Sequence, residues 1–186
     1  SGVSSVVMNL YRNINREIIQ FDFLVSKRTE ESYEEEIHRY GGNVFYTGNP
    51  LSPKTLIGTW IRNRQFFREN SRKYVAAHLH SPTITDMTIK YANKYGLKNI
   101  IIHSHSTMSS INPLKSFINT FLQRNIFKYA NLYFACSTEA AEFLYGKKFC
   151  KEHKIELIKN AVEPEKYLFD AECKKKIIDG WGWNGN

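Results

Sequence analysis

Four of the six histidines stand in two His-x-His pairs, His78 with His80 and His103 with His105. Each pair follows a short apolar run, so both pairs are predicted at the carboxyl ends of buried strands. Parallel α/β sheets bind their ligands at that edge. A histidine there can donate a hydrogen bond to a sugar hydroxyl or a phosphate oxygen, or accept a proton, because its ordinary pKa is about 6.5. The competing interpretation of each ring is a structural histidine bonded to the backbone.

The same spacing suits a metal ion, because residues two apart in a strand share a face and imidazole is a common zinc ligand. A catalytic metal site usually adds a carboxylate or a further ligand, and Asp86 is the only nearby acid in the sequence. We therefore expect neither a metal ion nor another cofactor. A metal-dependent hydrolase that uses the His-x-His pairs stays open as an alternative.

Two positions with small side chains also suit ligand binding. Gly2 lies in Ser1–Ser5, which is predicted as a turn ahead of an apolar helix and would let a ligand approach the backbone and the helix N-terminus. Ser137 follows a predicted strand and precedes a helix with Glu139 in its first turn. For both positions the competing interpretation, which the local sequence favours, is a helix N-cap.

Short apolar runs alternate with longer amphipathic stretches, which is typical of strands and helices in a parallel sheet. The predicted strands are 20–25, 43–47, 74–78, 98–103, 131–136 and 154–158. The clearest predicted helices are 33–40, 53–69, 83–95, 113–130 and 138–145. Glycine closes the first, third and fifth of these helices. The sequence therefore predicts an α/β fold, a Rossmann-like parallel sheet with helices on both faces.

The two ends of the chain depart from a complete doubly wound domain. The first predicted element is a helix, Val3 to Arg12, whereas such a domain begins with a strand. We therefore expect a missing first strand, which would come from upstream or whose place an oligomeric partner would fill. At the other end, residues 174–178 are predicted as a short helix and residues 180–186 as irregular. We divide the chain into one domain, 1–169, and a linker or truncated tail, 170–186.

The excess of basic over acidic residues indicates which classes of partner the protein could bind. The 186 residues include 26 Lys and Arg against 18 Asp and Glu, a formal net charge of +8. This excess favours an anionic partner, either a phosphorylated substrate, a membrane surface or nucleic acid. Basic and apolar side chains in 113–130 and basic side chains in 62–73 suit a membrane surface; the competing interpretation is a core face with solvated charges. No binding motif supports nucleic acid, which we do not expect.

Location is predicted from three features. The sequence contains no apolar run of the roughly 18 to 20 residues that span a bilayer. Its start lacks the pattern of a signal peptide. The three cysteines are odd in number and have no metal-type spacing, as in proteins that keep their thiols reduced. We expect a cytoplasmic protein.

Segments in a fixed order resemble the N-terminal domain of the family 4 retaining glycosyltransferases, which have the GT-B fold of two Rossmann-like domains. These segments are 2–3 with 6–12, 20–24, 41–42, 78–81, 103–106, 133–137 and 158–162. Each segment is unspecific, but the series is similar to the branch that builds capsular and extracellular polysaccharides. The resemblance covers residues 1 to about 169.

The resemblance implies roles for single residues. His103 or His105 would line the cleft where the sugar passes to the acceptor hydroxyl, and we take both as the candidate catalytic residues. Gly2 would lie beside the donor phosphates and the acceptor, with His80 nearby. Together with Ser137, these two are the candidate acceptor- or phosphate-binding residues.

The resemblance also implies a second domain. Asn160 opens the segment Asn160-Ala161-Val162, which is similar to the family segment that leads into the interdomain linker. The donor-binding half of the family, with its pair of glutamates seven residues apart, has no counterpart in these residues. Ser4 stands where the family turn usually carries an acid, so any role of that acid is lost or changed.

The function that the resemblance implies is transfer of a hexosyl group from a nucleotide sugar to a polysaccharide or lipid-linked glycan precursor, with retention of configuration and without a metal. This chain would bind the acceptor and would be inactive alone. It would work in the cytoplasm, at the inner face of the membrane if it contacts anionic lipid. The alternatives are an α/β module that binds a glycan or lipid without chemistry, and the metal-dependent hydrolase.

Overall fold

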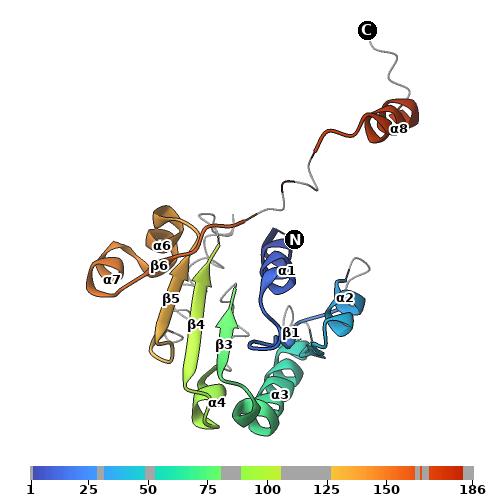
Figure 1. Ribbon diagram of the computed structural model, residues 1–186. Helices are drawn as coiled ribbons and strands as arrows, with labels where there is room; N and C mark the ends of the chain where they lie inside the picture. Colours follow the sequence, from blue (N-terminus) through green and yellow to red (C-terminus); the bar gives the residue numbers. More distant parts are fainter. Residues whose placement is uncertain are drawn as a thin grey trace.

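Six parallel strands are present in the computed structural model, which describes residues 2–28, 32–48, 53–80, 89–105, 127–161, 164 and 168–181. One sheet pairs β1 (Phe23–Val25) with β2 (Val44–Tyr46). The other has the order β3 (Ala76–Leu79), β4 (Asn99–Ser104), β5 (Leu132–Ala135) and β6 (Glu156–Leu157), as Figure 1 shows. All six predicted strands are confirmed, with ends shifted by up to three residues.

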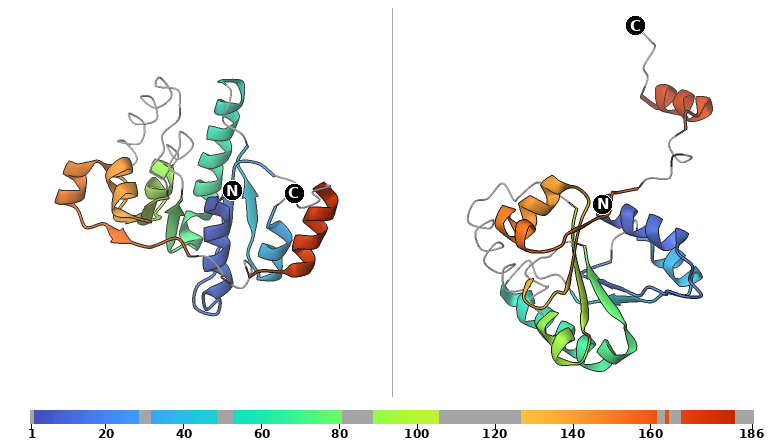
Figure 2. Two further views of the ribbon diagram at one scale, coloured as in Figure 1. Left: turned by 90° about the horizontal axis from the view of Figure 1, so that it is seen from above. Right: turned by 60° about the vertical axis from the view of Figure 1, so that its left-hand side comes forward.

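Helices lie around the strands, so the α/β, Rossmann-like prediction is confirmed. In the right-hand view of Figure 2, α1 (blue) lies on one side of the strands and α6 and α7 (orange) lie on the other. The helices are α1 (Gly2–Asn13), α2 (Glu34–Arg39), α3 (Pro53–Asn70), the 3-10 turn η1 (Ser71–Lys73), α4 (Ile89–Lys94), α6 (Thr138–Tyr145), α7 (Lys147–Glu152) and α8 (Ala171–Trp181). The predicted helical residues 83–88 and 113–126 lie outside the described residues.

Glycine ends three of these helices where it was predicted to do so. Gly96 follows α4 with φ +103°, and Gly146 follows α6 with φ +84°. Both angles lie in the region that residues with a Cβ rarely adopt. After α2, a Cβ at Gly42 would lie 2.6 Å from the Phe21 carbonyl oxygen and 2.7 Å from the Tyr11 hydroxyl, so the chain needs glycine there.

The main core lies on one face of the four-stranded sheet. Ile100 and Ile102 of β4 are completely buried against α4 and α6 residues such as Ala92 and Ala140. Successive side chains of a strand point to opposite faces. His103 therefore points away from this core, on the face opposite α6, while Ser104 returns to it and donates a hydrogen bond to the Ala140 carbonyl at 2.7 Å.

A smaller core joins α1 to β1 and α2, around the buried Met8, Tyr11 and Ile37. The Tyr74 hydroxyl connects the two regions by donating a hydrogen bond to Asp22 Oδ2 at 2.7 Å. Among the described strands, β1 pairs only with β2 and β3 pairs only with β4, so each has one edge without a partner. A further strand, from upstream or from an oligomeric partner, stays a prediction.

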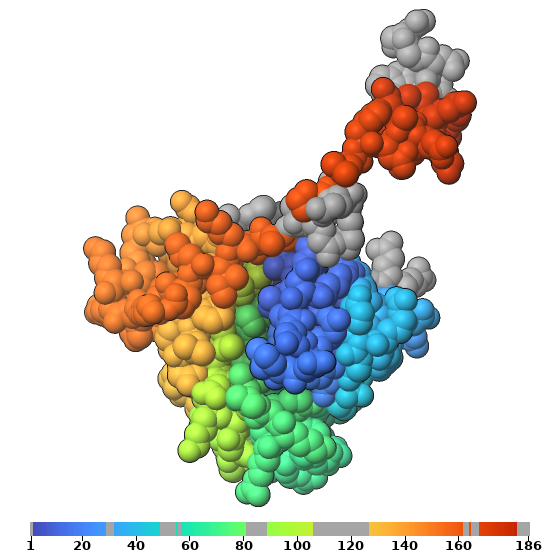
Figure 3. All heavy atoms as spheres, viewed as in Figure 1, coloured from blue at the N-terminus to red at the C-terminus, as the bar shows by residue number. Residues whose placement is uncertain are grey.

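The C-terminal helix α8 lies apart from the two sheets (Figures 1 and 3) and contains no buried residue. It includes the helix predicted at 174–178 but continues through Gly180 and Trp181, which were wrongly predicted to be irregular. No helix in the described part of the chain is long and apolar enough to span a membrane. The division at residue 169 stays a prediction.

Candidate active site

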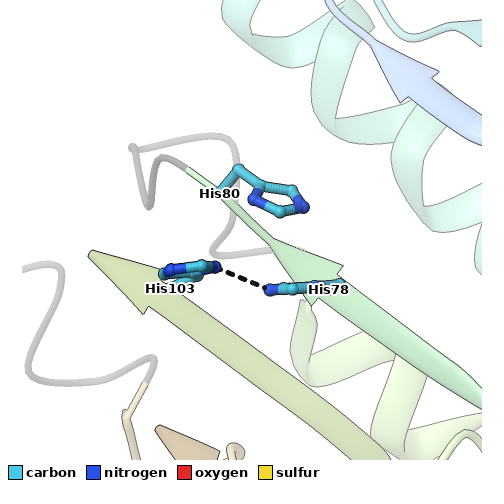
Figure 4. A group of neighbouring side chains, drawn as sticks. All are labelled: His78, His80 and His103. Carbon is cyan, nitrogen blue, oxygen red and sulfur yellow. Dashed lines mark hydrogen bonds between the residues drawn. The ribbon is translucent and has the colours of Figure 1, made fainter. Parts of the chain in front are cut away.

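The two His-x-His pairs lie at the carboxyl ends of β3 and β4, the edge of the sheet where they were predicted, and they meet there on one face. β3 and β4 are parallel neighbours with Leu79 level with Ile102, which sets His80 level with His103. Within each pair the rings lie close together, with centroids 4.0 Å apart for His78 and His80 and 3.9 Å apart for His103 and His105. We call these four residues the histidine cluster; Figure 4 shows three of them.

Hydrogen bonds connect the rings between the two strands. His78 Nε2 lies 3.2 Å from His103 Nδ1, the contact drawn as a dashed line in Figure 4. His80 Nδ1 lies 2.9 Å from His105 Nε2. The chain of contacts continues to a residue far away in sequence, because His105 Nδ1 lies 3.0 Å from Asn160 Oδ1. Each strand thus fixes the orientation of the rings on the other.

These contacts determine where the protons lie when the rings are neutral. A carbonyl oxygen only accepts hydrogen bonds, so Asn160 Oδ1 requires the proton of His105 on Nδ1. His105 Nε2 then accepts, and His80 donates to it from Nδ1. A neutral imidazole carries one N–H, which leaves a lone pair on His80 Nε2. The cluster therefore presents a proton-free nitrogen that can bind an electrophile or accept a hydrogen bond.

Burial and mutual repulsion keep three of the rings neutral. His103 is only 3% exposed, and its Nε2 has no hydrogen-bond partner among the described residues. Burial, reinforced by the positive charges that His105 and His78 would carry, lowers the pKa of His103 to about 3, although the Ile158 carbonyl opposes the shift. Burial and neighbouring rings likewise lower the pKa of His78 to about 4 and that of His80 to about 2. Near neutral pH these three rings act as hydrogen-bonding groups.

The lowered pKa values predict a loss of stability in mild acid. Between about pH 6.5 and 4 the unfolded chain binds protons that the folded cluster rejects, so the free energy of unfolding falls as pH falls, by up to about 1.4 kcal/mol per pH unit for each histidine. Above about pH 7 neither state binds these protons and the effect disappears. Urea unfolding of wild type at pH 7.5 and 5.5 measures the loss.

The matched variants for this experiment are His80→Gln and His153→Gln, because His153 is exposed and lies outside the cluster. His80→Gln should lose roughly 1 kcal/mol less than wild type between the two pH values, and His153→Gln should lose as much as wild type. The same loss in wild type and in His80→Gln would contradict the burial of the ring.

Asn160 was predicted only as part of an interdomain linker, but it also contacts the histidine cluster. It follows β6, and the next residue is held as well, because Asn9 of α1 donates a hydrogen bond to the Ala161 carbonyl at 3.0 Å. Residues 160 and 161 thus connect the cluster to α1. Whether this segment leads to a second domain stays a prediction.

Ser137 is the N-cap of α6. Its side chain accepts a hydrogen bond from the Ala140 backbone N–H at 3.1 Å, and its own backbone is extended. The favoured interpretation as a cap is confirmed. Contact between Ser137 and a ligand stays a prediction. Its position after the carboxyl end of β5 would allow such a contact.

Gly2 is the first residue of α1, so the helix predicted from Val3 to Arg12 is confirmed, whereas the turn predicted at Ser1–Ser5 is wrong for residues 2–5. The amino end of α1 lies at the same end of the molecule as the tips of β3 and β4 in Figure 1 and in the right-hand view of Figure 2. A Cβ at Gly2 would meet no atom within 4 Å. A ligand contact at Gly2 stays a prediction.

His78 belongs to the cluster but was not predicted as a site residue. The choice of His80 rested on the resemblance, although the i, i+2 spacing already placed His78 on the same face. Nitrogen atoms of His78, His80 and His103 all lie within 4.8 Å of one another, and among the described residues no carboxylate belongs to this group. Asp86, the acid considered for a hydrolase, lies outside the described residues.

Comparison with known proteins gives two matches. The family described as Glycosyltransferase Family 4 matches residues 1–166. A protein of Bacillus subtilis (strain 168) named "Putative glycosyltransferase EpsF" is 30% identical over 180 residues, which cover 92% of this chain and 45% of that protein. The chain thus spans about half the length of this relative. No solved structure gives a significant match.

Proposed function

Because the chain belongs to glycosyltransferase family 4, we propose that it is the acceptor-binding domain of an enzyme that transfers a sugar from a nucleotide sugar to a polysaccharide or lipid-linked glycan precursor. The observation that carries this proposal is the histidine cluster, with Asn160 bonded to it, at the strand ends where α/β sheets bind ligands. Neutral imidazoles offer the donors and acceptors that sugar hydroxyls and phosphate oxygens require.

We assign His105 and His103 as the catalytic pair. His105 is partly exposed and has one partner on each nitrogen, so its ring is held in one orientation. Its partner Asn160 is exposed, and a substrate oxygen can replace that amide. His103 is buried, so it reaches the substrate less directly and keeps His78 in place through their shared hydrogen bond.

The remaining parts of the proposal concern the whole enzyme. His80, Gly2 and Ser137 bind the acceptor or a phosphate. The reaction retains configuration, transfers a hexosyl group in capsular or extracellular polysaccharide synthesis and needs no metal. A donor-binding domain completes a GT-B enzyme, and the coverage of less than half of the relative supports a further part of similar size.

The protein works in the cytoplasm, and its net charge of +8 supports contact with an anionic surface at the inner face of the membrane.

The experiment that tests this function uses the longer protein that includes the second domain. It is incubated with a panel of nucleotide sugars and a membrane lipid extract as the acceptor, and release of the nucleotide is measured together with labelled sugar in the lipid fraction. We expect one nucleotide sugar to release its nucleotide only when the lipid extract is present. Release that is independent of any acceptor, or that requires Zn²⁺, would favour a hydrolase, and binding without release would favour a non-catalytic module.

A further inference from the structure

The histidine cluster, where we propose that sugar transfer takes place, also has the ligand set of a transition-metal site. We propose that His78, His80 and His103 bind one Zn²⁺ ion per chain, and that the bound ion excludes substrate from these nitrogens. This inference rests on the proposed function. Because the proposed transfer needs no metal, an ion bound at this site would inhibit it. Its evidence is the arrangement of the three rings and of the hydrogen bonds behind them.

The spacing of the rings fits a tetrahedral ion. Two nitrogens that each lie about 2.0–2.1 Å from a tetrahedral Zn²⁺ are separated by about 3.3–3.4 Å. His78 Nε2 and His103 Nδ1 are 3.2 Å apart, and the ligand atoms of all three residues lie within 4.8 Å of one another. The His80 ring must move closer to the other two when the ion binds, and its strand β3 lies at the edge of the four-stranded sheet among the described strands.

Protons do not obstruct binding. The ion needs a lone pair from each ring, and His80 Nε2 already has one because its Nδ1 donates to His105. Between His78 and His103 a single proton occupies the contact, and it moves to the outer nitrogen of its own ring when the ion binds. Each neutral ring keeps one proton, which solvent water can carry between its two nitrogens, so binding of the ion neither releases nor takes up a proton overall.

The outer hydrogen bonds of a metal site are present for His80. Metal-binding histidines usually donate their second N–H to an acceptor that fixes the ring, and loss of this acceptor weakens binding about 10- to 100-fold. His80 donates to His105, and His105 donates to Asn160. The third ligand, His103, is held in the buried centre of the sheet.

The chemistry of the ligands selects the ion. Three imidazoles suit Zn²⁺ and similar transition metals, whereas Mg²⁺ and Ca²⁺ require oxygen ligands. No carboxylate belongs to the group among the described residues. Three histidines leave a fourth position for water or an anion. An ion held there occupies the nitrogens of His80 and His103, two of the residues assigned to the substrate, which makes it an inhibitor.

Isothermal titration of the 186-residue chain with Zn²⁺, after removal of any histidine-containing tag, tests the site without substrate. We expect one ion per chain and no heat with Mg²⁺. His78→Gln and His80→Gln should each weaken binding more than about 100-fold, and His105→Ala should weaken it about 10- to 100-fold. His153→Gln is the matched control and should bind as wild type, with folding of every variant checked by circular dichroism.

Equal binding by wild type, His78→Gln and His80→Gln would overturn the site, and so would a loss in His153→Gln that matches theirs. Visible absorption of bound Co²⁺ gives a second measurement, because its intensity reports tetrahedral coordination, and a weak octahedral spectrum would also count against the site. No donor or acceptor takes part in these experiments, so their failure would leave the proposed transferase intact. Loss of transfer activity would, in turn, leave the ion-binding result unchanged.

Discussion

The longer enzyme carrying His105→Ala is expected to transfer sugar about 10²- to 10³-fold more slowly than wild type at saturating substrate, the usual cost of removing a preorganised hydrogen-bonding group from a reacting centre. The His105 ring is fixed on both sides, by His80 at 2.9 Å and by Asn160 at 3.0 Å. It therefore needs no reorientation when charge develops on the transferred sugar. Measurement of kcat by nucleotide release gives the size of the effect.

The substitution should leave the fold intact, because His105 is partly exposed and lies on the face opposite the main core. A rise in KM with kcat unchanged would show that His105 acts in binding only. Asn160→Ala tests the hydrogen bond behind the ring. It should lower kcat less than His105→Ala does, since it frees the ring without removing it.

Residues 1–186 alone are expected to show no transfer above background with any nucleotide sugar, a larger loss than any single substitution. Transfer between two domains requires that both enclose the donor, and the half that would hold the nucleotide is proposed to lie outside this chain. The chain covers only 45% of its relative in Bacillus subtilis. Labelled-sugar transfer by the chain and by the longer protein, at equal concentration, makes the comparison.

Sustained turnover by the 186-residue chain would contradict this division of labour. The fold of the chain is the control, because an unfolded sample would also be inactive. Cooperative urea unfolding provides that check, and it can be followed through the tyrosines buried in the two cores, such as Tyr11 and Tyr145.

The strands and the meeting of the histidine pairs could be predicted from the sequence. Apolar runs such as Ile100–Ile102 are long enough to identify a buried strand, and parallel strands end at one edge of a sheet. The i, i+2 spacing then requires both rings of a pair to share a face. These rules depend only on local pattern, and all of them applied here.

The contact between Asn160 and His105 could not be predicted, because the two residues are 55 positions apart and no local rule relates them. The direction of the hydrogen bonds also depends on this contact. Local rules failed in two further places. The helix α7 is only six residues long, too short for periodicity to identify it. The helix predicted from Val3 is present as α1, but the turn that small side chains suggested at Ser1–Ser5 is not, because α1 already begins at Gly2.

The most direct test of the central claim, that sugar transfer takes place at the histidine cluster, is the ratio of kcat between His105→Ala and His153→Ala in the longer enzyme. His153 is exposed and its ring stacks on Phe149 at 3.8 Å, far from the cluster in sequence, so its removal controls for the loss of an imidazole. We predict a ratio below about 10⁻², with His153→Ala equal to wild type. A ratio within about threefold of one would contradict the account.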